Sequence, residues 1–361
     1  MKVVIVGAGL AGPLLAQGLT RAGITVELYE RDRADRPAQG YRVHLEPEGD
    51  LALRECLSPD RYEQVVATSG KRGTGVRILS PGLEVVHEIL VPESAETDET
   101  GHHRTVDRGT LRRLLLEGLE LRDGASFERY ELLPDGRVRT FFADGAVTDA
   151  DLLVGADGTY SPVRGQLLPH AVVEDTGQAT IFGRTPLTER SRPLVPAAAL
   201  DGFCAVAGDD GRFMPLAAHE YRSGGEDYLM WVIGAPRSRF PADLAALDQS
   251  SLRDTAADLV ADWPAPLAGL VRLSEPNSLY ATTIRSARRP PRWDTVPVTL
   301  MGDAAHTMVP AGIGAAVALR DAATLCRGLT SGESLSDAVR GYENAMLDYG
   351  FAAVERSRRA G

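Results

Sequence analysis

"KVVIVGAGLAGPLLAQGLTRAGITVELYE", residues 2–30, carries the strongest fold signal of the chain. Residues 2–6 are a β-branched run without alternation, which is typical of a parallel strand buried on both faces. Apolar residues at helical spacing follow over residues 13–21, Gly23 marks a helix end, and residues 24–30 return to a strand pattern. The stretch therefore predicts a β-α-β unit whose first turn is GAGLAG.

Three glycines in this turn, Gly7, Gly9 and Gly12, have the G-x-G-x-x-G spacing of a dinucleotide-binding loop. The first glycine allows a tight turn, the second lets the backbone approach a pyrophosphate, and the third lets the helix pack on the strand. Glu30 ends the second strand, where its carboxylate can accept hydrogen bonds from a ribose diol. An acid there favours a nucleotide with a free 2′-hydroxyl over NADP, and it leaves NAD and FAD both open.

Two later segments repeat the pattern of a buried strand, a turn with an aspartate, and a helix. In "DLLVGADGTYSPVR", residues 151–164, Asp157 lies on a tight turn, and in "LMGDAAHTMVPAGIGAA", residues 300–316, Asp303 precedes a glycine-rich helix start. A carboxylate at such a position can bind a sugar-alcohol hydroxyl, while helix N–H groups can face an electron-rich ring edge. A mononucleotide needs one such anchor, so three along the chain indicate a long, extended cofactor.

The composition excludes several classes of partner. A net charge of −11 over 361 residues argues against nucleic acid or an anionic membrane. The three cysteines, Cys56, Cys204 and Cys326, lack disulfide or metal spacing, so we expect reduced, buried thiols and no metal. No apolar run is long enough to span a membrane, and glycines interrupt the N-terminal run where a signal peptide would continue. We therefore expect a cytoplasmic protein.

Taken together, the glycines of the first turn, Glu30, "ADLLVGADGTYSPVR" (150–164) and "VTLMGDAAHTMVPAGIG" (298–314) resemble the single-component (group A) FAD-dependent aromatic hydroxylases. This family contains para-hydroxybenzoate hydroxylase. "VDRGTLRRLLLEGL", residues 106–119, is similar to the helix that carries an FAD-contacting arginine in the family, here Arg108. The resemblance covers nearly the whole chain, most firmly residues 1–60, 103–168 and 296–330.

The expected fold class is α/β, with a Rossmann-like FAD-binding domain, an inserted antiparallel β-sheet substrate domain and a helical C-terminus. The FAD-binding domain is discontinuous in sequence and comprises residues 1–72, 102–171 and 286–361, with the C-terminal helices. Residues 73–101 and 172–285 form the substrate domain, because alternating segments separated by turns predict an antiparallel sheet with one covered face.

The resemblance implies that FAD binds non-covalently, with its pyrophosphate on Gly7–Gly12, its adenosine ribose on Glu30 and its ribityl chain on Asp303. The backbone after Pro310 would face the isoalloxazine ring, and Asp157 would lie near the groove that admits NAD(P)H. The full set of expected FAD contacts is Gly7, Gly9, Leu10, Ala11, Gly12, Glu30, Arg31, Arg42, Arg108, Asp157, Asp303, Gly312, Ile313, Gly314, Ala315 and Ala316.

The family's chemistry is reduction of FAD by NAD(P)H, addition of O2 to form a flavin hydroperoxide, and oxygen transfer to an activated ring. We expect a small aromatic or polyketide-like substrate and a monomer or homodimer. Arg42 and His44 lie where the mobile flavin loop of the family passes the active site, so they are catalytic candidates together with Pro310. Hydroxylation, Baeyer–Villiger oxidation and epoxidation all stay open, as do NADH and NADPH.

The chain departs from the family pattern in one place. Ala316 stands where such proteins usually have an asparagine, and the turn PAGIG is one residue short, which can weaken FAD binding or alter its redox potential. An FAD-binding protein without redox turnover, acting as a sensor or ligand-protecting partner, is therefore an alternative. Another flavin oxidoreductase on the same fold is a second alternative, although the lone Trp231 of "LMWVIG" does not supply the tryptophan-rich signature of the halogenases.

Several side chains have two readings on the sequence alone. His306 either tunes the cofactor or caps a strand end, and His102-His103 is expected to be a solvated loop. The basic stretch "RSARRPPRW", residues 285–293, either attracts an anionic ligand or forms a solvated edge. One group of apolar residues forms either a substrate pocket or ordinary sheet core: Phe203, Phe213, Met214, Tyr228 and Trp231.

Overall fold

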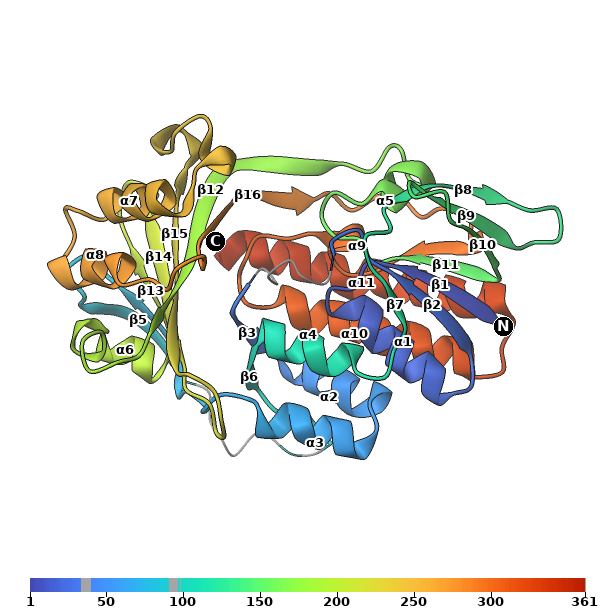
Figure 1. The fold of residues 1–361 in the computed structure, drawn as a ribbon, viewed down its shortest axis with the longest axis horizontal. Coiled ribbons are helices and arrows are strands. Elements are labelled where there is room, and N and C mark those ends of the chain that lie inside the picture. The colour runs from blue at the N-terminus through green and yellow to red at the C-terminus, as the bar shows by residue number, and fades with distance from the viewer. Residues whose placement is uncertain (34–39, 91–96, 98, 361) are drawn as a thin grey trace.

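The computed structural model describes residues 1–33, 40–90, 97 and 99–360 (Figure 1). A five-stranded parallel sheet of order β17-β11-β1-β2-β7 forms its centre. Val3 pairs with both Leu152 and Val26, so the N-terminal strand lies between β11 and β2. The apolar runs that predicted buried parallel strands are thus adjacent in space. The strands are β1 (Lys2–Val6), β2 (Thr25–Tyr29), β7 (Leu121–Arg122), β11 (Leu152–Gly155) and β17 (Val298–Leu300).

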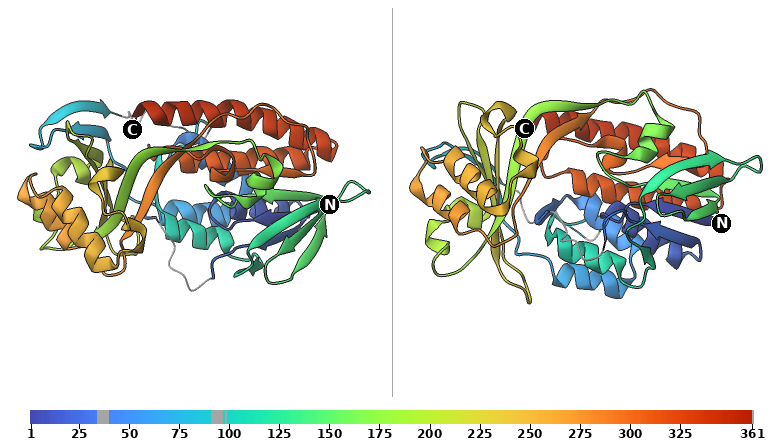
Figure 2. Two further views of the ribbon diagram at one scale, coloured as in Figure 1. Left: turned by 90° about the horizontal axis from the view of Figure 1, so that it is seen from above. Right: turned by 45° about the horizontal axis from the view of Figure 1, so that its top comes forward.

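Helices pack on one face of this sheet. The helix that follows the first turn, α1, contacts β2 and α10, and α10 also packs against α2 and α11. The long helix α11 runs along the molecule (Figures 1 and 2). Near its end, Arg358 donates to Glu174 and Ser286, which belong to the second lobe, the seven-stranded sheet described below. The helices are α1 (Ala11–Arg21), α2 (Pro47–Cys56), α3 (Pro59–Ala67), α4 (Arg108–Leu116), α5 (Pro162–Leu167), α9 (Asp303–His306), α10 (Gly314–Thr330) and α11 (Leu335–Ala360).

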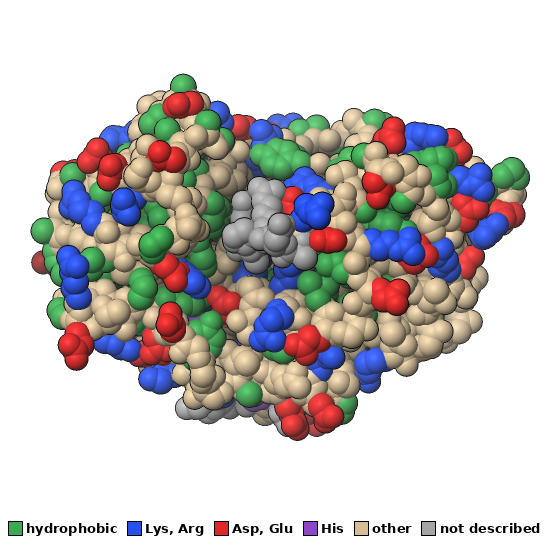
Figure 3. Space-filling model, viewed as in Figure 1, with side chains coloured by type: hydrophobic (Ala, Val, Ile, Leu, Met, Phe, Trp, Pro, Cys, Tyr) green, Lys and Arg blue, Asp and Glu red, His purple; other side chains and the backbone are tan. Residues whose placement is uncertain are grey.

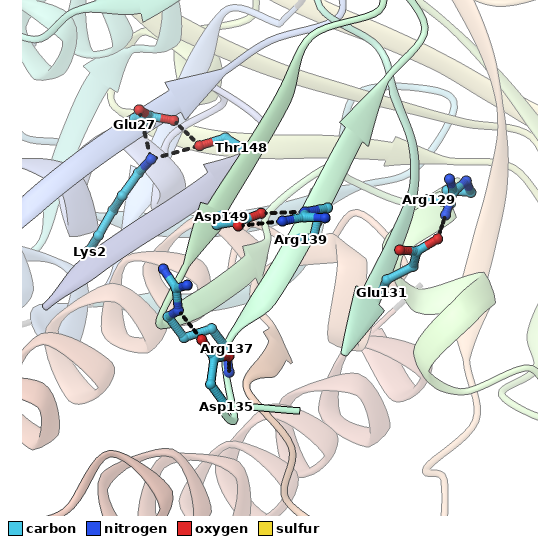
Figure 4. A network of polar contacts seen from close by, with 9 residues as sticks. All are labelled: Lys2, Glu27, Arg129, Glu131, Asp135, Arg137, Arg139, Thr148 and Asp149. Atoms are coloured by element: carbon cyan, nitrogen blue, oxygen red, sulfur yellow. Dashed lines mark hydrogen bonds and ion pairs between the residues drawn. The ribbon is translucent and has the colours of Figure 1, made fainter. Parts of the chain in front are cut away.

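A three-stranded antiparallel sheet, β8 (Phe127–Leu132), β9 (Val138–Phe142) and β10 (Val147–Ala150), packs on the parallel sheet. The rings of Tyr29 and Phe142 stack at 3.9 Å between the two. Polar contacts reinforce this packing at its rim (Figure 4). Lys2 Nζ lies 3.0 Å from Glu27 Oε1 and donates to Thr148 Oγ1 at 2.6 Å, which links β1, β2 and β10.

The second lobe is a seven-stranded sheet of order β16-β12-β15-β14-β13-β4-β5. Its pairs are antiparallel except for β13 with β4, which is parallel and was not expected. Helices α7 and α8, also absent from the prediction, lie beside this sheet (Figure 1). The elements are β4 (Gly75–Leu79), β5 (Val85–Leu90), β12 (Val173–Pro186), α6 (Ala197–Leu200), β13 (Gly202–Ala207), β14 (Phe213–His219), β15 (Tyr228–Pro236), α7 (Gln249–Leu259), α8 (Ala265–Arg272) and β16 (Tyr280–Ala287).

Each sheet has its own hydrophobic core. The parallel sheet, its helices and the three-stranded sheet share one cluster of buried side chains, while the seven-stranded sheet shares another with α7 and α8. The predicted fold class, a discontinuous Rossmann-like domain with an inserted, largely antiparallel sheet and a helical C-terminus, is confirmed. The exact residue boundaries between the two domains stay a prediction.

A short two-stranded ribbon lies between the lobes. It consists of β3 (Arg42–Leu45) and β6 (Arg104–Asp107), and both strands contact β14 of the seven-stranded sheet. The three cysteines are free and buried, as expected. The sulfur atoms of Cys56 and Cys326 both lie next to Gly18 of α1, so these two cysteines are neighbours. Among the described residues, no helix combines the length and apolarity needed to cross a membrane.

Candidate cofactor and substrate site

The three predicted turns meet at the carboxyl ends of β1, β11 and β17. A Cβ on Gly7 would lie 2.2 Å from the carbonyl oxygen of Ala156, so the first turn touches the turn of Asp157. The N–H of Met301 bonds to the carbonyl of Gly155 at 2.9 Å, which brings in the third turn. Ligands of open α/β sheets bind at such strand ends. Tertiary structure therefore unites motifs that are separated by almost 300 residues.

The glycines of the first turn divide into two kinds. Gly7 has φ +111°, and a Cβ on Gly12 would lie 2.1 Å from the carbonyl oxygen of Gly7, so both positions exclude a side chain. A Cβ on Gly9, by contrast, would meet no atom of the described residues within 4 Å. Helix α1 starts here without a side-chain N-cap, so its first N–H groups suit a phosphate. Open space beside an uncapped helix fits the pyrophosphate of FAD.

Glu30 lies directly beside this turn. Its Oε2 accepts the N–H of Ala8 at 2.8 Å and its Oε1 accepts the N–H of Asp32 at 3.1 Å. Arg112 of α4, which sequence reasoning missed, donates through Nε to the carbonyl of Ala8 at 2.5 Å. The neighbouring Arg31 is exposed, and Leu10 and Ala11 are buried at the start of α1.

The turn of Asp157 is joined to the turn of Asp303 by an arginine. Arg164 donates to the carbonyl of Thr159 at 2.7 Å and to the carbonyl of Ala304 at 2.9 Å. Asp157 Oδ2 accepts the N–H of Val163 at 3.2 Å, whereas its Oδ1 is buried without a partner among the described residues. Burial raises the pKa of Asp157, although hydrogen bonding by the Ser161 side chain and the Val163 backbone opposes the rise. An unpartnered oxygen here fits a hydroxyl donor of a ligand.

The turn of Asp303 depends on Gly302, which has φ +58°. The N–H of Gly302 donates to Oδ2 of Asp321 at 2.7 Å, and the same oxygen lies 2.7 Å from Nε2 of His306. His306 is thus buried under the turn. The charge of Asp321 raises the pKa of His306 despite its burial. Asp303 itself is exposed at the helix start.

Sequence reasoning missed Asp321, although the sequence held a signal. It lies four residues after Val317 and four before Leu325, on the buried stripe of α10, where an acid requires a partner.

The turn before α10 presents its backbone and buries some of its side chains. Pro310 and Gly312 are exposed, whereas Ile313 packs with Val317 in a small apolar cluster. Helix α10 begins at Gly314 without a side-chain N-cap. Ala316 is 1% exposed, and a Cβ on Gly49 would lie 3.0 Å from both its Cα and its Cβ. The side chain of Ala316 therefore faces α2, while Ala315 is half-buried beside it.

The ribbon β3–β6 carries the predicted catalytic candidates. Arg42 is buried, and His44 Nε2 lies 3.1 Å from His103 Nδ1, so His103 is not simply part of a solvated loop. Burial lowers the pKa of His44 to about 4, and the charge of Arg42 adds to the effect. Arg108 begins α4, close to Gly40, where a Cβ would lie 2.8 Å from its Cδ.

The seven-stranded sheet divides its apolar residues between two faces. Trp231 and Met214 belong to its core, and Trp231 donates to Thr185 Oγ1 at 3.2 Å. Tyr228 belongs to a separate cluster with Met230, against which Phe203 packs. This cluster includes Tyr41, which lies next to β3, so it faces the ribbon; we call it the inner face. The sequence could not separate pocket from core because both alternate along the same strands.

The basic stretch before β17 is engaged at the surface. Arg288 pairs with Glu174 at 2.5 Å and Arg289 with Asp348 at 2.6 Å. These contacts favour a solvated edge. Positive and negative side chains are likewise interspersed over the face of the molecule shown in Figure 3.

The fold is an α/β fold whose glycine turn and aspartate turns meet at the carboxyl ends of the parallel strands, where open α/β sheets bind dinucleotides, with an aromatic sheet face on the second lobe. The chain belongs to the FAD-binding family of group A aromatic hydroxylases and monooxygenases, because residues 134–357, more than half of it, match the family model described as "FAD binding domain".

Individual relatives agree with this assignment. A dual O-methyltransferase/FAD-dependent monooxygenase of Phaeosphaeria nodorum is 31% identical over 90% of this chain, which aligns with 40% of that protein. The chain thus spans less than half of this relative. The aurachin C monooxygenase/isomerase of Stigmatella aurantiaca is 28% identical over all of this chain and 89% of its own length.

A solved structure described as an FAD-containing monooxygenase of Photorhabdus luminescens superimposes with a TM-score of 0.86. It is 30% identical and covers 99% of this chain and 97% of its own.

Proposed function

We propose that the protein is an FAD-dependent monooxygenase that uses NAD(P)H and O2 to oxygenate a small aromatic or polyketide-like substrate. One observation carries the proposal: turns at the ends of β1, β11 and β17 converge on one edge, and an aromatic sheet face lies across the β3–β6 ribbon from it. Hydride acceptance and activation of O2 are the chemistry that FAD supplies when bound.

The chain's own residues have separable tasks in this proposal. The N–H groups at the start of α1 bind the pyrophosphate beside Gly9, Glu30 binds the adenosine ribose, and Asp303 binds the ribityl chain. The start of α10 presents backbone N–H groups from Gly314 onward to the ring. Pro310 and Gly312 lie exposed in front of it. The open space at Gly9 and the buried, unpartnered Oδ1 of Asp157 support a bound ligand along this edge.

His44 is placed to contact a substrate hydroxyl in the same proposal. Burial lowers its pKa to about 4, so the imidazole is neutral near pH 7 and a ring nitrogen can accept a hydrogen bond from that hydroxyl. A group with so low a pKa is a weak base, so this contact polarises the hydroxyl and does not carry its proton away. The 3.1 Å contact between His44 Nε2 and His103 Nδ1 holds the imidazole in place.

The proposed setting is the cytoplasm, with the protein acting as a monomer or homodimer and not on nucleic acid or membrane. The net charge of −11 and the three free cysteines support this part of the proposal.

A direct experiment combines cofactor and turnover. Purified protein is denatured and the released flavin identified, and the native protein is then assayed for NADH and NADPH oxidation with a panel of phenols under 18O2. We expect release of FAD, stimulation of NAD(P)H oxidation by a substrate, and one 18O atom in the product. FAD release without NAD(P)H oxidation under any of these conditions would identify a flavin-binding protein without turnover. A colourless protein that does not take up FAD would remove the basis of the proposal.

A further inference from the structure

Arg42 is a buried cation that pairs with no acid of the described residues. Its side chain is 9% exposed, its Nε has no hydrogen-bond partner, and it forms no ion pair with any residue in the described ranges. Arg104, on the adjacent strand of the same ribbon, forms an ion pair with the buried Asp50. Burying an unpaired guanidinium is costly, so its persistence points to an anion that arrives with a ligand.

The acids around Arg42 are already engaged. Asp107 lies opposite Arg42 in the ribbon register, but its Oδ1 accepts the N–H of Thr110 at 2.8 Å. Its Oδ2 accepts the hydroxyl of Tyr228 at 2.9 Å. Glu275, beyond Tyr228, is paired with Arg184. Among the described residues, these acids therefore leave the hydrogen-bonding capacity of Arg42 available to a ligand.

His219 provides a second unpartnered group nearby. The side chain is fully buried, and neither ring nitrogen has a partner among the described residues. It lies opposite Tyr228 in the register of β14 and β15, and the two rings stack at 5.3 Å. Burial lowers the pKa of His219 to about 4, and the charge of Arg42 contributes. The imidazole is therefore neutral at pH 7 and has one N–H to donate.

Half-buried aromatic rings continue the inner face next to these two groups. Tyr41 lies edge-on to Tyr228 at 6.3 Å and 6.1 Å from Tyr280, which in turn stacks on Phe182 at 4.8 Å. Aromatic faces at this spacing suit a planar ring. A charged group and an aromatic wall thus lie together between the ribbon and the sheet.

We propose that Arg42, assisted by His219, binds an ionised oxygen on an aromatic substrate, either a phenolate or enolate oxygen of the ring or a carboxylate attached to it. This rests on the proposed function for the identity of the ligand as a substrate. Arg42 lies opposite Asp107 in the ribbon, and Asp107 Oδ2 accepts the hydroxyl of Tyr228, which is the register partner of His219 in the seven-stranded sheet. The subsite therefore faces the substrate side of the ribbon.

The test measures binding to FAD-loaded protein by equilibrium dialysis at pH 7.5. The probes are 2-hydroxy-1,4-naphthoquinone, which is ionised at this pH, its neutral methyl ether, and 2-naphthoate as the carboxylate. We expect at least one anion to bind about tenfold or more tightly than the ether. The anion whose binding depends more strongly on Arg42 shows whether the bound oxygen belongs to the ring or to an attached carboxylate. Equal affinities for the ether and both anions would overturn the proposal.

Three variants assign the effect. Arg42→Met replaces the charge with an apolar side chain of similar length, and we expect it to abolish the preference for the anion. Arg42→Lys should retain part of the preference, because it keeps the charge without the planar fork of donors. His219→Phe keeps an aromatic ring but removes its nitrogens, and we expect it to lose a smaller part of the preference for the anion. Preference unchanged in Arg42→Met would overturn the assignment.

Two further readouts separate this role from others. The resemblance alone implies that Arg42 contacts FAD, whereas the present proposal assigns it to the substrate. FAD affinity of Arg42→Met should therefore stay within about threefold of wild type, and a tenfold loss would make Arg42 a cofactor ligand instead. The ligand-free variant should be at least as stable as wild type, because no ion pair is lost. The protein could show an anion preference that depends on Arg42 and yet fail to oxidise NAD(P)H. That result would support the subsite and contradict only the proposed function.

Discussion

Nε2 of His306 lies 2.7 Å from Oδ2 of Asp321, and both side chains are buried. The same carboxylate also accepts the N–H of Gly302 and the hydroxyl of Tyr349, each at 2.7 Å. Asp321, on α10, therefore joins α9, α11 and the residue Gly302 that follows β17, under the turn that presents Asp303. The pair explains why a buried acid occurs in the apolar face of α10.

Asp321→Asn tests this support. The amide keeps the shape but loses the charge opposite His306, so we expect a loss of about 3 kcal/mol in the free energy of unfolding. Urea unfolding of the ligand-free protein measures it. Asp348→Asn, which breaks the exposed pair with Arg289, is the matched control and should change stability by less than about 1 kcal/mol. Equal changes in the free energy of unfolding in the two variants would show that the buried network stabilises the fold no more than an exposed ion pair does.

Gly7→Ala and Gly9→Ala separate folding from cofactor binding. At Gly7 the Cβ would collide with the carbonyl of Ala156, so we expect the fold itself to be destabilised by more than about 2 kcal/mol. At Gly9 the Cβ meets open space, so the ligand-free stability should change by less than about 1 kcal/mol. FAD affinity of Gly9→Ala should nevertheless fall at least tenfold in fluorescence titration. An unchanged FAD affinity in Gly9→Ala would show that the pyrophosphate does not bind beside Gly9.

Asp303→Ala should weaken FAD binding without unfolding the chain. The side chain is exposed, and the predicted loss of one charge-assisted hydrogen bond costs about 1.5–3 kcal/mol, or roughly tenfold to hundredfold in affinity. The thermal midpoint of the ligand-free variant serves as the control and should match wild type. Unchanged affinity would mean that Asp303 does not contact the ribityl chain.

Glu343 should make stability depend on pH. Burial raises its pKa from 4.5 to about 7, although hydrogen bonds from Thr299, Thr295 and Trp293 oppose the rise. Because the folded state binds this proton more tightly, its contribution is fully present below pH 4.5 and is lost as pH rises to 7. Glu343→Gln should therefore be more stable than wild type by about 3 kcal/mol at pH 8, and the difference should vanish near pH 4.5. A difference independent of pH in urea unfolding would contradict this.

Ala316→Asn tests the departure from the family pattern. The family resemblance alone suggests that an asparagine would add a hydrogen bond to the flavin. The structure instead packs Ala316 against Gly49, so the larger side chain should overpack the contact between α2 and α10 and cost about 1–3 kcal/mol in unfolding free energy. FAD affinity should not improve. A tighter complex in fluorescence titration would show that the amide reaches the cofactor.

Several long-range features were missed by sequence reasoning for a common reason. Arg112 and Arg164 look like ordinary polar positions of short helices, yet Arg112 donates to the carbonyl of Ala8 in the glycine turn and Arg164 to the carbonyl of Ala304 beside Asp303. Residues 249–272 contain helices α7 and α8, although the surrounding strands led to an expectation of sheet alone. Local pattern does not show which carbonyl a long side chain will meet.

The β-α-β unit, the glycine turn and the aspartate turns could be read from the sequence, because each follows from local rules. A parallel strand buried on both faces requires a continuous apolar run, and a tight turn that lets the backbone approach a pyrophosphate requires glycine. That Trp231 is core while Tyr228 faces the ribbon emerged only from the tertiary structure. So did the absence of any described partner for Nε of Arg42 and for both ring nitrogens of His219. Those outcomes depend on how the seven-stranded sheet docks on β3 and β6, and that docking is set by side chains more than 100 residues apart.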